Sequence, residues 1–373
     1  MTNDSANDVT AFRAAAHELV GAVVDAVEGL SEALRVLDRG SMGEGQSRLR
    51  PLQEPLAESL ATLGAISVPE QFGPLRGDLA RGAEAALEAL TAFTADGPRE
   101  GRSGNALASM RGHARAQELL YPMRSLDPIL GQLFAEPAVH DNLAALDAHR
   151  ADNPEVGIRR SGPDDDADAR GEFHLYVPES WDGSEPLPLV VALHGGMGHG
   201  RDFLWTWLRE ARSRRFLLLA PTSVGQTWAL MGPDVDRSRL LKAVEFVREH
   251  WQVAGDRILL TGLSDGATYG LSTFLAGDTP FAAMAAVAGV LHPKNVEAGV
   301  IRGAEGKRVS ITHGTKDWMF PVALARAAQE ALRGAGADVR YHEIEDLAHA
   351  YPREENDAIL AWFDESLSAR GSA

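Results

Sequence analysis

The sequence predicts an α/β fold: a mostly parallel, doubly wound sheet in the second half of the chain, preceded by an all-α helical bundle. Three observations lead to this prediction. Continuous apolar runs such as 188–193 and 257–261 are typical of strands buried on both faces of a parallel sheet. Helical patterns follow these runs, as expected for a doubly wound sheet. Residues 9 to about 150, by contrast, contain no convincing strand pattern.

The N-terminal region is expected to form an antiparallel four-helix bundle. In its first helix Ala16, Leu19, Val23, Ala26 and Leu30 recur at three- and four-residue spacing, which gives a broad apolar face. Similar patterns predict further helices over 51–63, 71–93, 105–120 and 126–134, the last two separated by a break near Pro122. Gly-rich connectors are expected at 40–45 and 96–104.

A linker rich in proline and aspartate is expected between the two halves. Residues 153–169 contain Pro154, Pro163 and the acidic run Asp164-Asp165-Asp166, which is typical of a solvated tether. We therefore expect a helical domain over 1–152, an acidic linker over 153–169 and a domain that contains the sheet over 170–373. Oligomerisation, capping of the active site and docking of a partner protein all remain open as roles for the bundle.

Gly262-Leu263-Ser264-Asp265-Gly266 is the most informative stretch of the chain. It follows a predicted strand and precedes a predicted helix over 267–275. A serine on such a sharp turn adopts a strained backbone, so only small residues fit two positions to either side. The turn also presents the hydroxyl at a helix N-terminus, where developing negative charge is favoured. The pentapeptide occurs by chance as well, but this context indicates that Ser264 is a nucleophile.

A serine nucleophile needs a base and an acid that orients the base. Asp317 follows the predicted strand 309–314, and His349 follows the predicted strand 339–344. In a parallel sheet both loops emerge at the carboxyl ends of the strands, where the side chains can converge. We therefore predict Asp317 as the acid and His349 as the base. Asp317 has an exposed turn as its alternative role and Glu343, Glu345 and Asp346 as rival acids. His349 has the other eleven histidines as rival bases, among which His313 is expected to be structural.

The predicted strand 188–193 runs into His194-Gly195-Gly196-Met197-Gly198-His199-Gly200. Glycines allow backbone N–H groups to approach a substrate closely. Acyl transfer places negative charge on the carbonyl oxygen, which pre-aimed N–H donors stabilise. We expect the amide of Asp265 and that of Gly196 or Met197 to form this oxyanion hole. His194 and Gly195 are candidate substrate contacts, with bracing of the loop as the alternative for His194.

Four segments together resemble a known family: LVVALHGGMGHG, LLTGLSDGA, THGTKDWMFP and DLAHAYP. Residues from about 170 to 368 resemble a serine esterase of the α/β-hydrolase superfamily. The phospholipase/carboxylesterase and polyhydroxybutyrate-depolymerase-like branches are the most similar. The resemblance implies a Ser264–His349–Asp317 triad and an oxyanion loop at His194-Gly195-Gly196. It covers a little over half of the chain and does not extend to the N-terminal region.

Composition excludes several other classes of function. The net charge of −17 disfavours nucleic acid and anionic membranes as partners. The absence of cysteine rules out disulfides, zinc–thiolate sites and a thiol nucleophile. No apolar run approaches the roughly 18 residues of a membrane span, and the first residues lack the pattern of a signal peptide. We expect a cytoplasmic protein that needs no cofactor and no metal.

Aromatic and methionine side chains lie close in sequence to the predicted site. Trp228, Trp318 and Met319 are candidate pocket residues, which would suit a small apolar or aromatic ester. The expected reaction is hydrolysis of a carboxylic ester through an acyl-enzyme intermediate. A serine peptidase or amidase on the same fold, or a non-catalytic binding protein that uses the helical bundle, remain alternatives. Assembly into a homo-oligomer through the bundle is also open.

Overall fold

The computed structural model describes residues 3–35, 42–96, 99–163, 165–166 and 168–368. The chain divides into two compact units, Met1–Pro137 and Ala138–Ala373. Gly40 of the first expected connector and Asp164 of the expected linker lie outside the described residues. The division between domains near residues 150–168 stays a prediction.

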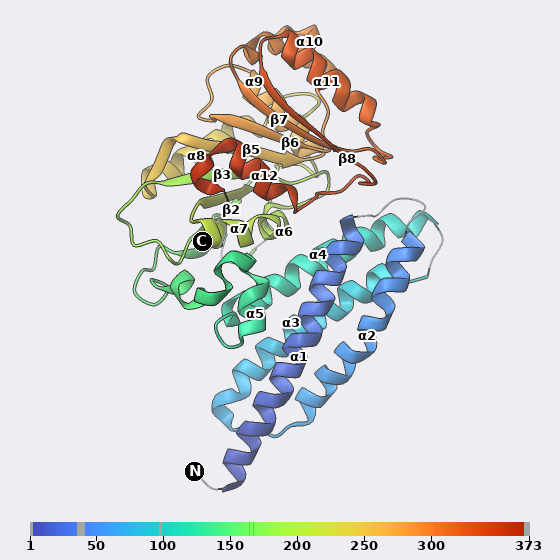
Figure 1. Cartoon of the computed structure of the whole chain (residues 1–373), viewed down its shortest axis with the longest axis vertical. Coiled ribbons are helices and arrows are strands. Elements are labelled where there is room, and N and C mark those ends of the chain that lie inside the picture. The colour runs from blue at the N-terminus through green and yellow to red at the C-terminus, as the bar shows by residue number, and fades with distance from the viewer. Residues whose placement is uncertain (1–2, 36–41, 97–98, 164, 167, 369–373) are drawn as a thin grey trace. The chain divides into compact units, whose positions relative to one another are not determined.

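Unit 1 is helical, as the sequence predicts. Its four long helices pack along one another (Figure 1). They are α1 (Asn3–Arg35), α2 (Met42–Ala65), α3 (Gly73–Thr94) and α4 (Arg99–Leu120). Shorter helices are η1 (Glu70–Phe72), η2 (Tyr121–Met123) and α5 (Pro128–Leu133), and η3 (Pro137–Asp147) runs into unit 2.

Two helices of unit 1 begin earlier than the sequence predicts. Helix α2 starts at Met42 and contains both Pro51 and Pro55, where we expected the helix to start at Pro51. An interior proline costs a helix roughly 3 kcal/mol. Here Leu49, Leu56 and Leu63 recur every seven residues and are fully buried, which offsets part of that cost. Helix α4 starts at Arg99, so the expected connectors over 43–45 and 99–104 are helical instead.

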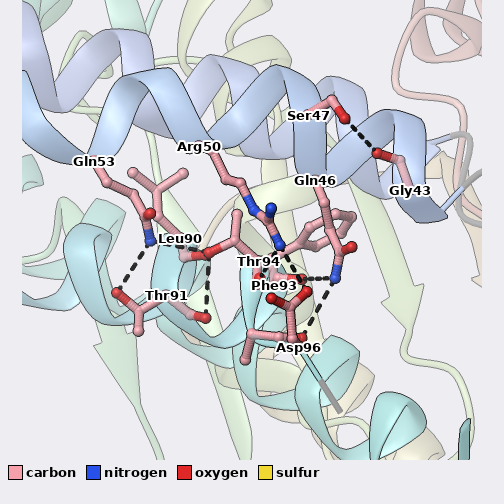
Figure 2. Close-up of polar contacts among 11 residues, drawn as sticks. Gly43, Gln46, Ser47, Arg50, Gln53, Leu90, Thr91, Phe93, Thr94 and Asp96 are labelled. Carbon is pink, nitrogen blue, oxygen red and sulfur yellow. Dashed lines mark hydrogen bonds and ion pairs between the residues drawn. The ribbon is translucent and has the colours of Figure 1, made fainter. Parts of the chain in front are cut away.

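Side chains of α2 cap the C-terminal end of α3 (Figure 2). The Gln46 amide donates to the carbonyl oxygens of Phe93 at 3.2 Å and Ala95 at 3.4 Å. The Arg50 guanidinium donates to the Thr94 carbonyl at 3.4 Å and to the Asp96 carboxylate at 2.7 Å. The last carbonyls of a helix have no intrahelical donor, and a cation is favoured beside them. These contacts therefore fix α2 against the end of α3.

Unit 2 contains an eight-stranded sheet in the order β1-β2-β4-β3-β5-β6-β7-β8. The pairs β1/β2 and β2/β4 are antiparallel, and all other pairs are parallel. This confirms the mostly parallel sheet that the sequence predicts. The strands are β1 (Gly157–Arg160), β2 (Phe173–Val177), β3 (Leu187–Leu193), β4 (Leu217–Pro221), β5 (Val253–Leu263), β6 (Ala283–Val287), β7 (Arg308–Gly314) and β8 (Asp338–Ile344).

Helices flank this sheet and cover its apolar strands (Figure 1). Every residue of β3, β4 and β6 is buried, because these strands lie inside the sheet. Helix α9 packs against β5 and β6, and α11 packs against β7 and β8. The helices of unit 2 are α6 (Gly200–Phe203), η4 (Leu204–Thr206), α7 (Leu208–Arg214), α8 (Arg237–His250), α9 (Asp265–Leu275), α10 (Pro293–Glu297), η5 (Val300–Ala304), α11 (Val322–Gly334), α12 (Glu355–Phe363) and η6 (Glu365–Leu367). Within the described ranges, none of the helices of either unit is long and apolar enough to cross a membrane.

The strand order brings three loops together at one edge of the sheet. Strand β3 lies between β4 and β5, so the chain leaves β3 toward one side and then crosses to the other. Ligands bind at such a switch point, beside the carboxyl ends of the strands. The register pairs Leu193 at the end of β3 with Gly262 near the end of β5. The loops that follow β3, β4 and β5 therefore start side by side.

Candidate active site

Ser264 lies on a strained turn between β5 and α9. Its backbone has φ 55° and ψ −116°, a conformation that residues with a side chain rarely adopt. A Cβ on Gly262 would lie 2.6 Å from the Gly266 carbonyl carbon. A Cβ on Gly266 would lie 2.4 Å from the His194 carbonyl oxygen. Both positions therefore require glycine, and the turn is pressed against the end of β3.

The side chains of Ser264, His349 and Asp317 form one hydrogen-bonded chain. His349 Nε2 lies 2.9 Å from Ser264 Oγ, and His349 Nδ1 lies 2.8 Å from Asp317 Oδ2. The other carboxylate oxygen, Oδ1, accepts hydrogen bonds from the amides of Met319 at 2.9 Å and Phe320 at 2.8 Å. Three residues from three separate loops thus meet, although their sequence positions lie far apart.

The charge on Asp317 determines where the proton of His349 lies. Burial alone would raise the pKa of Asp317. Hydrogen bonds from His313, His349 and the Phe320 amide outweigh burial and hold that pKa well below its usual range. An ionised carboxylate only accepts hydrogen bonds, so His349 donates from Nδ1. In the neutral imidazole Nε2 is then the acceptor, and it faces the hydroxyl of Ser264.

Residues 238–366 match the family described as phospholipase/carboxylesterase. The matched segment holds Ser264, Asp317 and His349. Unit 2 has the α/β-hydrolase fold, and the family that matches part of it is one of ester hydrolases. The fold that the resemblance implies is therefore confirmed, and the matched family agrees with the expected reaction class. We call unit 2, after its fold, the hydrolase unit from here on.

Solved structures of esterases are similar to part of the chain. Esterase PE8 is 21% identical over 56% of this chain and 99% of its own, with a TM-score of 0.41. Thermogutta terrifontis esterase 2 phosphonylated by sarin is 15% identical over 56% of this chain and 95% of its own, with a TM-score of 0.44. A thermostable esterase is 23% identical over 50% of this chain, which spans 54% of that esterase, with a TM-score of 0.40. No match was found among curated proteins.

The loop after β3 in the hydrolase unit is folded back on itself. The Gly198 amide donates to the Gly195 carbonyl at 3.0 Å, and Met197 has φ 60°. The Met197 amide donates to the Gln226 carbonyl at 2.8 Å, so this amide already has an acceptor. Of the two oxyanion donors predicted as alternatives, the geometry favours Gly196 over Met197. A Cβ on Gly196 would lie 2.6 Å from Asp265 Oδ2, so the loop closely approaches the residue after Ser264.

His194 braces the loop after β3 through hydrogen bonds of its ring. It is 1% exposed, and burial lowers its pKa to about 3, so it stays neutral near pH 7. Nδ1 donates to the Gly195 carbonyl at 2.7 Å, and Nε2 accepts from the Ser223 amide at 3.0 Å. Both ring nitrogens and the Gly195 carbonyl oxygen therefore already have hydrogen-bond partners within the protein. The geometry favours the bracing role for His194 over direct contact with substrate, and it gives Gly195 the same role.

Trp228 is a core residue of the hydrolase unit. Its ring is 3% exposed and stacks on Tyr269 with ring centroids 5.3 Å apart. Its Nε1 donates to the His194 carbonyl at 2.8 Å. It also lines a cavity of about 340 Å³ between β2 and α8, whose lining does not include Ser264, Asp317 or His349. We therefore leave Trp228 out of the proposed substrate pocket.

Trp318 and Met319 lie at the surface beside His349. They are 45% and 46% exposed, and the Trp318 ring centroid lies 6.4 Å from that of His349. The Phe320 ring lies closer, at 5.4 Å, in an edge-on arrangement. Met197, on the loop after β3, is 55% exposed. Apolar side chains thus lie next to the base and on the loop after β3.

The loop after β4 supports the site, and sequence reasoning missed it. Arg170 donates to the Gly198 carbonyl at 3.2 Å, to Ser223 Oγ at 2.9 Å and to the Gly225 carbonyl at 2.6 Å. The apolar run 216–220, which is typical of a buried strand, is the signal in the sequence that could have pointed to this loop. As for metals, the described part of the chain contains no group of three or more His, Asp or Glu side chains arranged to hold an ion.

Proposed function

We propose that the hydrolase unit is a serine carboxylesterase in which Ser264, His349 and Asp317 act as a catalytic triad. The observation that carries this proposal is the continuous chain of hydrogen bonds, 2.9 Å from Ser264 to His349 and 2.8 Å from His349 to Asp317. The two distances lie in the range expected for a nucleophile, its base and the group that orients the base. The strained backbone of Ser264 supports the same role.

The reaction proceeds in two halves. Ser264 Oγ attacks the ester carbonyl carbon while His349 Nε2 takes the hydroxyl proton. The tetrahedral intermediate collapses as the bond to the alcohol oxygen breaks, and His349 returns the proton to that oxygen. Water then attacks the acyl-enzyme with His349 again as the base, which releases the carboxylic acid and restores Ser264. Asp317 keeps the imidazole oriented and stabilises its positive charge in both halves.

The backbone amides of Asp265 and Gly196 would form the oxyanion hole. Asp265 begins α9, so its amide lies at the helix N-terminus, where negative charge is favoured. Gly196 lies against the Asp265 side chain, which places the two amides on adjacent segments. Loss of one such donor costs about 2.7–4 kcal/mol of transition-state stabilisation.

The substrate class that fits this site is an uncharged ester with an apolar acyl or alkyl part. Trp318 and Met319 supply exposed apolar surface beside His349. Contact with such surface is favourable in proportion to the apolar area removed from water. We therefore expect kcat/KM to rise with acyl length until the chain extends beyond these side chains.

Hydrolysis of p-nitrophenyl esters from C2 to C12 by the full chain tests the proposal. Ser264→Ala should lose at least a thousandfold in kcat, because the variant lacks the hydroxyl that forms the proposed acyl-enzyme. Ser272→Ala is the matched control, since it removes a hydroxyl from α9, the helix that follows Ser264. That hydroxyl donates to the Thr268 carbonyl and accepts from Asn295. Retained turnover in Ser264→Ala would refute the proposed nucleophile. Faster cleavage of p-nitroanilides than of the matching esters would point to an amidase instead.

A further inference from the structure

A second histidine lies behind the proposed acid. His313, near the end of β7, has an exposure of 0%. Its Nε2 lies 2.7 Å from the Phe320 carbonyl oxygen and 3.3 Å from Asp317 Oδ2. Its Nδ1 is buried and has no hydrogen-bond partner among the residues that the structure describes. The sequence suggested only a structural role for this residue.

These neighbours determine which nitrogen of His313 carries the proton. A carbonyl oxygen and an ionised carboxylate can only accept, so the proton lies on Nε2, which donates to the Phe320 carbonyl and has Asp317 Oδ2 within 3.3 Å. A proton on Nδ1 would be buried without an acceptor, which is costly. The environment therefore favours the imidazole protonated at Nε2 alone. This tautomer gives Asp317 a donor on the side opposite to Ser264 in the hydrogen-bonded chain.

Asp317 thus receives hydrogen bonds at both carboxylate oxygens. Oδ1 accepts from two backbone amides, whereas Oδ2 accepts from His349 Nδ1 at 2.8 Å and lies 3.3 Å from His313 Nε2. Rotation of the carboxylate about its Cβ–Cγ bond would break all of these bonds together. The buried side chain of His313 therefore also contacts Asp317 Oδ2, the oxygen that faces His349.

We propose that His313 is a positioning residue, which holds Asp317 Oδ2 in the orientation that His349 needs. This inference rests on the proposed function. In the proposed triad, His313 contacts neither the substrate nor Ser264. The bond to the Phe320 carbonyl also ties the turn after β7 to the strand. A purely structural residue would support this turn without any effect on the chemical step.

Three variants of the full chain separate these two roles. His313→Leu removes the donor, whereas His313→Gln keeps an N–H donor at about the position of Nε2. Thr312→Val is the matched control, because the neighbouring Thr312 hydroxyl is also buried and has no partner in the described residues. We expect His313→Leu to lower kcat about tenfold to hundredfold with KM within about threefold, since a hydrogen bond to a charged group is lost. His313→Gln should recover most of that loss, and Thr312→Val should behave as the wild type.

Wild-type kcat in His313→Leu would overturn the inference, as would a folded His313→Gln variant as slow as His313→Leu. The protonation state is tested without activity by 15N NMR of the histidine side chains near pH 7. We expect His313 to carry its proton on Nε2, and a proton on Nδ1 would overturn the inference even if the leucine variant fails to fold. If the wild type hydrolyses no ester, the proposed function fails, and the NMR result still decides the position of this proton.

Discussion

The Thr227 hydroxyl donates a hydrogen bond of 2.6 Å to the carboxylate of Asp265, the residue directly after Ser264. The preceding residue, Gln226, accepts from the Met197 amide at 2.8 Å. One loop after β4 therefore contacts both segments that carry the proposed oxyanion amides. Its position should matter for the stabilisation of the transition state, although neither residue takes part in the proposed proton transfers.

Thr227→Val tests the importance of this loop. The change keeps the shape of the side chain but removes the donor to Asp265, so the loop after β4 loses this link to the segment that carries the Asp265 amide. Because Asp265 is half-buried, we expect a moderate fall in kcat of about tenfold with little change in KM. Thr227→Ser keeps the hydroxyl and serves as the control in the same steady-state assay. Equal kcat values for the valine and serine variants would contradict the role of this bond.

Gly196→Ala tests how close the loop after β3 lies to Asp265. The new Cβ would lie 2.6 Å from Asp265 Oδ2, so either the carboxylate or the loop must move. We expect kcat to fall about a hundredfold as the Gly196 amide is displaced from the oxyanion. Asp265→Ala removes the obstacle and keeps the Asp265 amide.

The double variant makes this prediction specific. In an Asp265→Ala background, Gly196→Ala should cost much less in kcat than it does in the wild type. Additive losses in the double-mutant cycle would mean that the two side chains do not compete for the same space.

The serine turn could be predicted from sequence because steric crowding restricts the residues on both sides of it to glycine. Gly262 and Gly266 are required by contacts with residues a few positions away or at the end of the adjacent strand, so the pattern carries the geometry. His349 and Asp317 could be predicted because strand order places their loops at one edge of the sheet. The pairing of Arg170 with the loop after β4 could not, since it depends on tertiary contacts between residues far apart in sequence.

Burial of particular side chains was also beyond the sequence. Trp228 lies in a Gly- and Thr-rich segment typical of a surface loop, yet its ring is enclosed by Tyr269 and His194. In unit 1, Pro51 resembled a helix start, but the burial of leucines on both sides extends α2 through it. In both places tertiary packing outweighs a local signal.

The buried neutral state of His194 should make the hydrolase unit less stable in acid. Burial lowers its pKa to about 3, whereas the unfolded chain binds a proton below about pH 6.5. The unfolded state therefore binds more protons between these values, and stability falls by up to about 1.4 kcal/mol per pH unit as the pH drops. The stabilisation is fully present above pH 6.5. His199, whose pKa burial also lowers, acts in the same direction.

Urea unfolding at pH 7, 6 and 5 measures this effect. All seven tryptophans lie in residues 138–373, so their fluorescence reports the hydrolase unit. His194→Asn should show a shallower loss of stability between pH 6.5 and 5 than the wild type. The same slope in both proteins would mean that His194 takes up its proton in the folded state.

Gly112→Ala should destabilise unit 1. A Cβ there would lie 2.8 Å from Ala89 Cβ and 3.2 Å from Ala89 Cα, so α3 and α4 would have to separate. Overpacking of this kind costs about 1–3 kcal/mol, which opposes the roughly 1 kcal/mol that alanine gains in helix propensity. Gly104→Ala, in the same helix and with nothing within 4 Å of the new Cβ, should stabilise α4 instead. Circular dichroism at 222 nm during urea unfolding gives the urea midpoint of each variant. An equal change of the midpoint in both variants would refute the close contact between Gly112 and Ala89.

Covalent labelling of the full chain by a fluorophosphonate is the most direct test of the proposed esterase mechanism. Mass spectrometry of the digested protein should find a single adduct, on the peptide that contains Ser264. His349→Ala should label at least a hundredfold more slowly, because its serine has no base to accept the proton. An adduct on another serine, or no adduct on a folded wild-type protein, would contradict the assignment of Ser264 as the nucleophile.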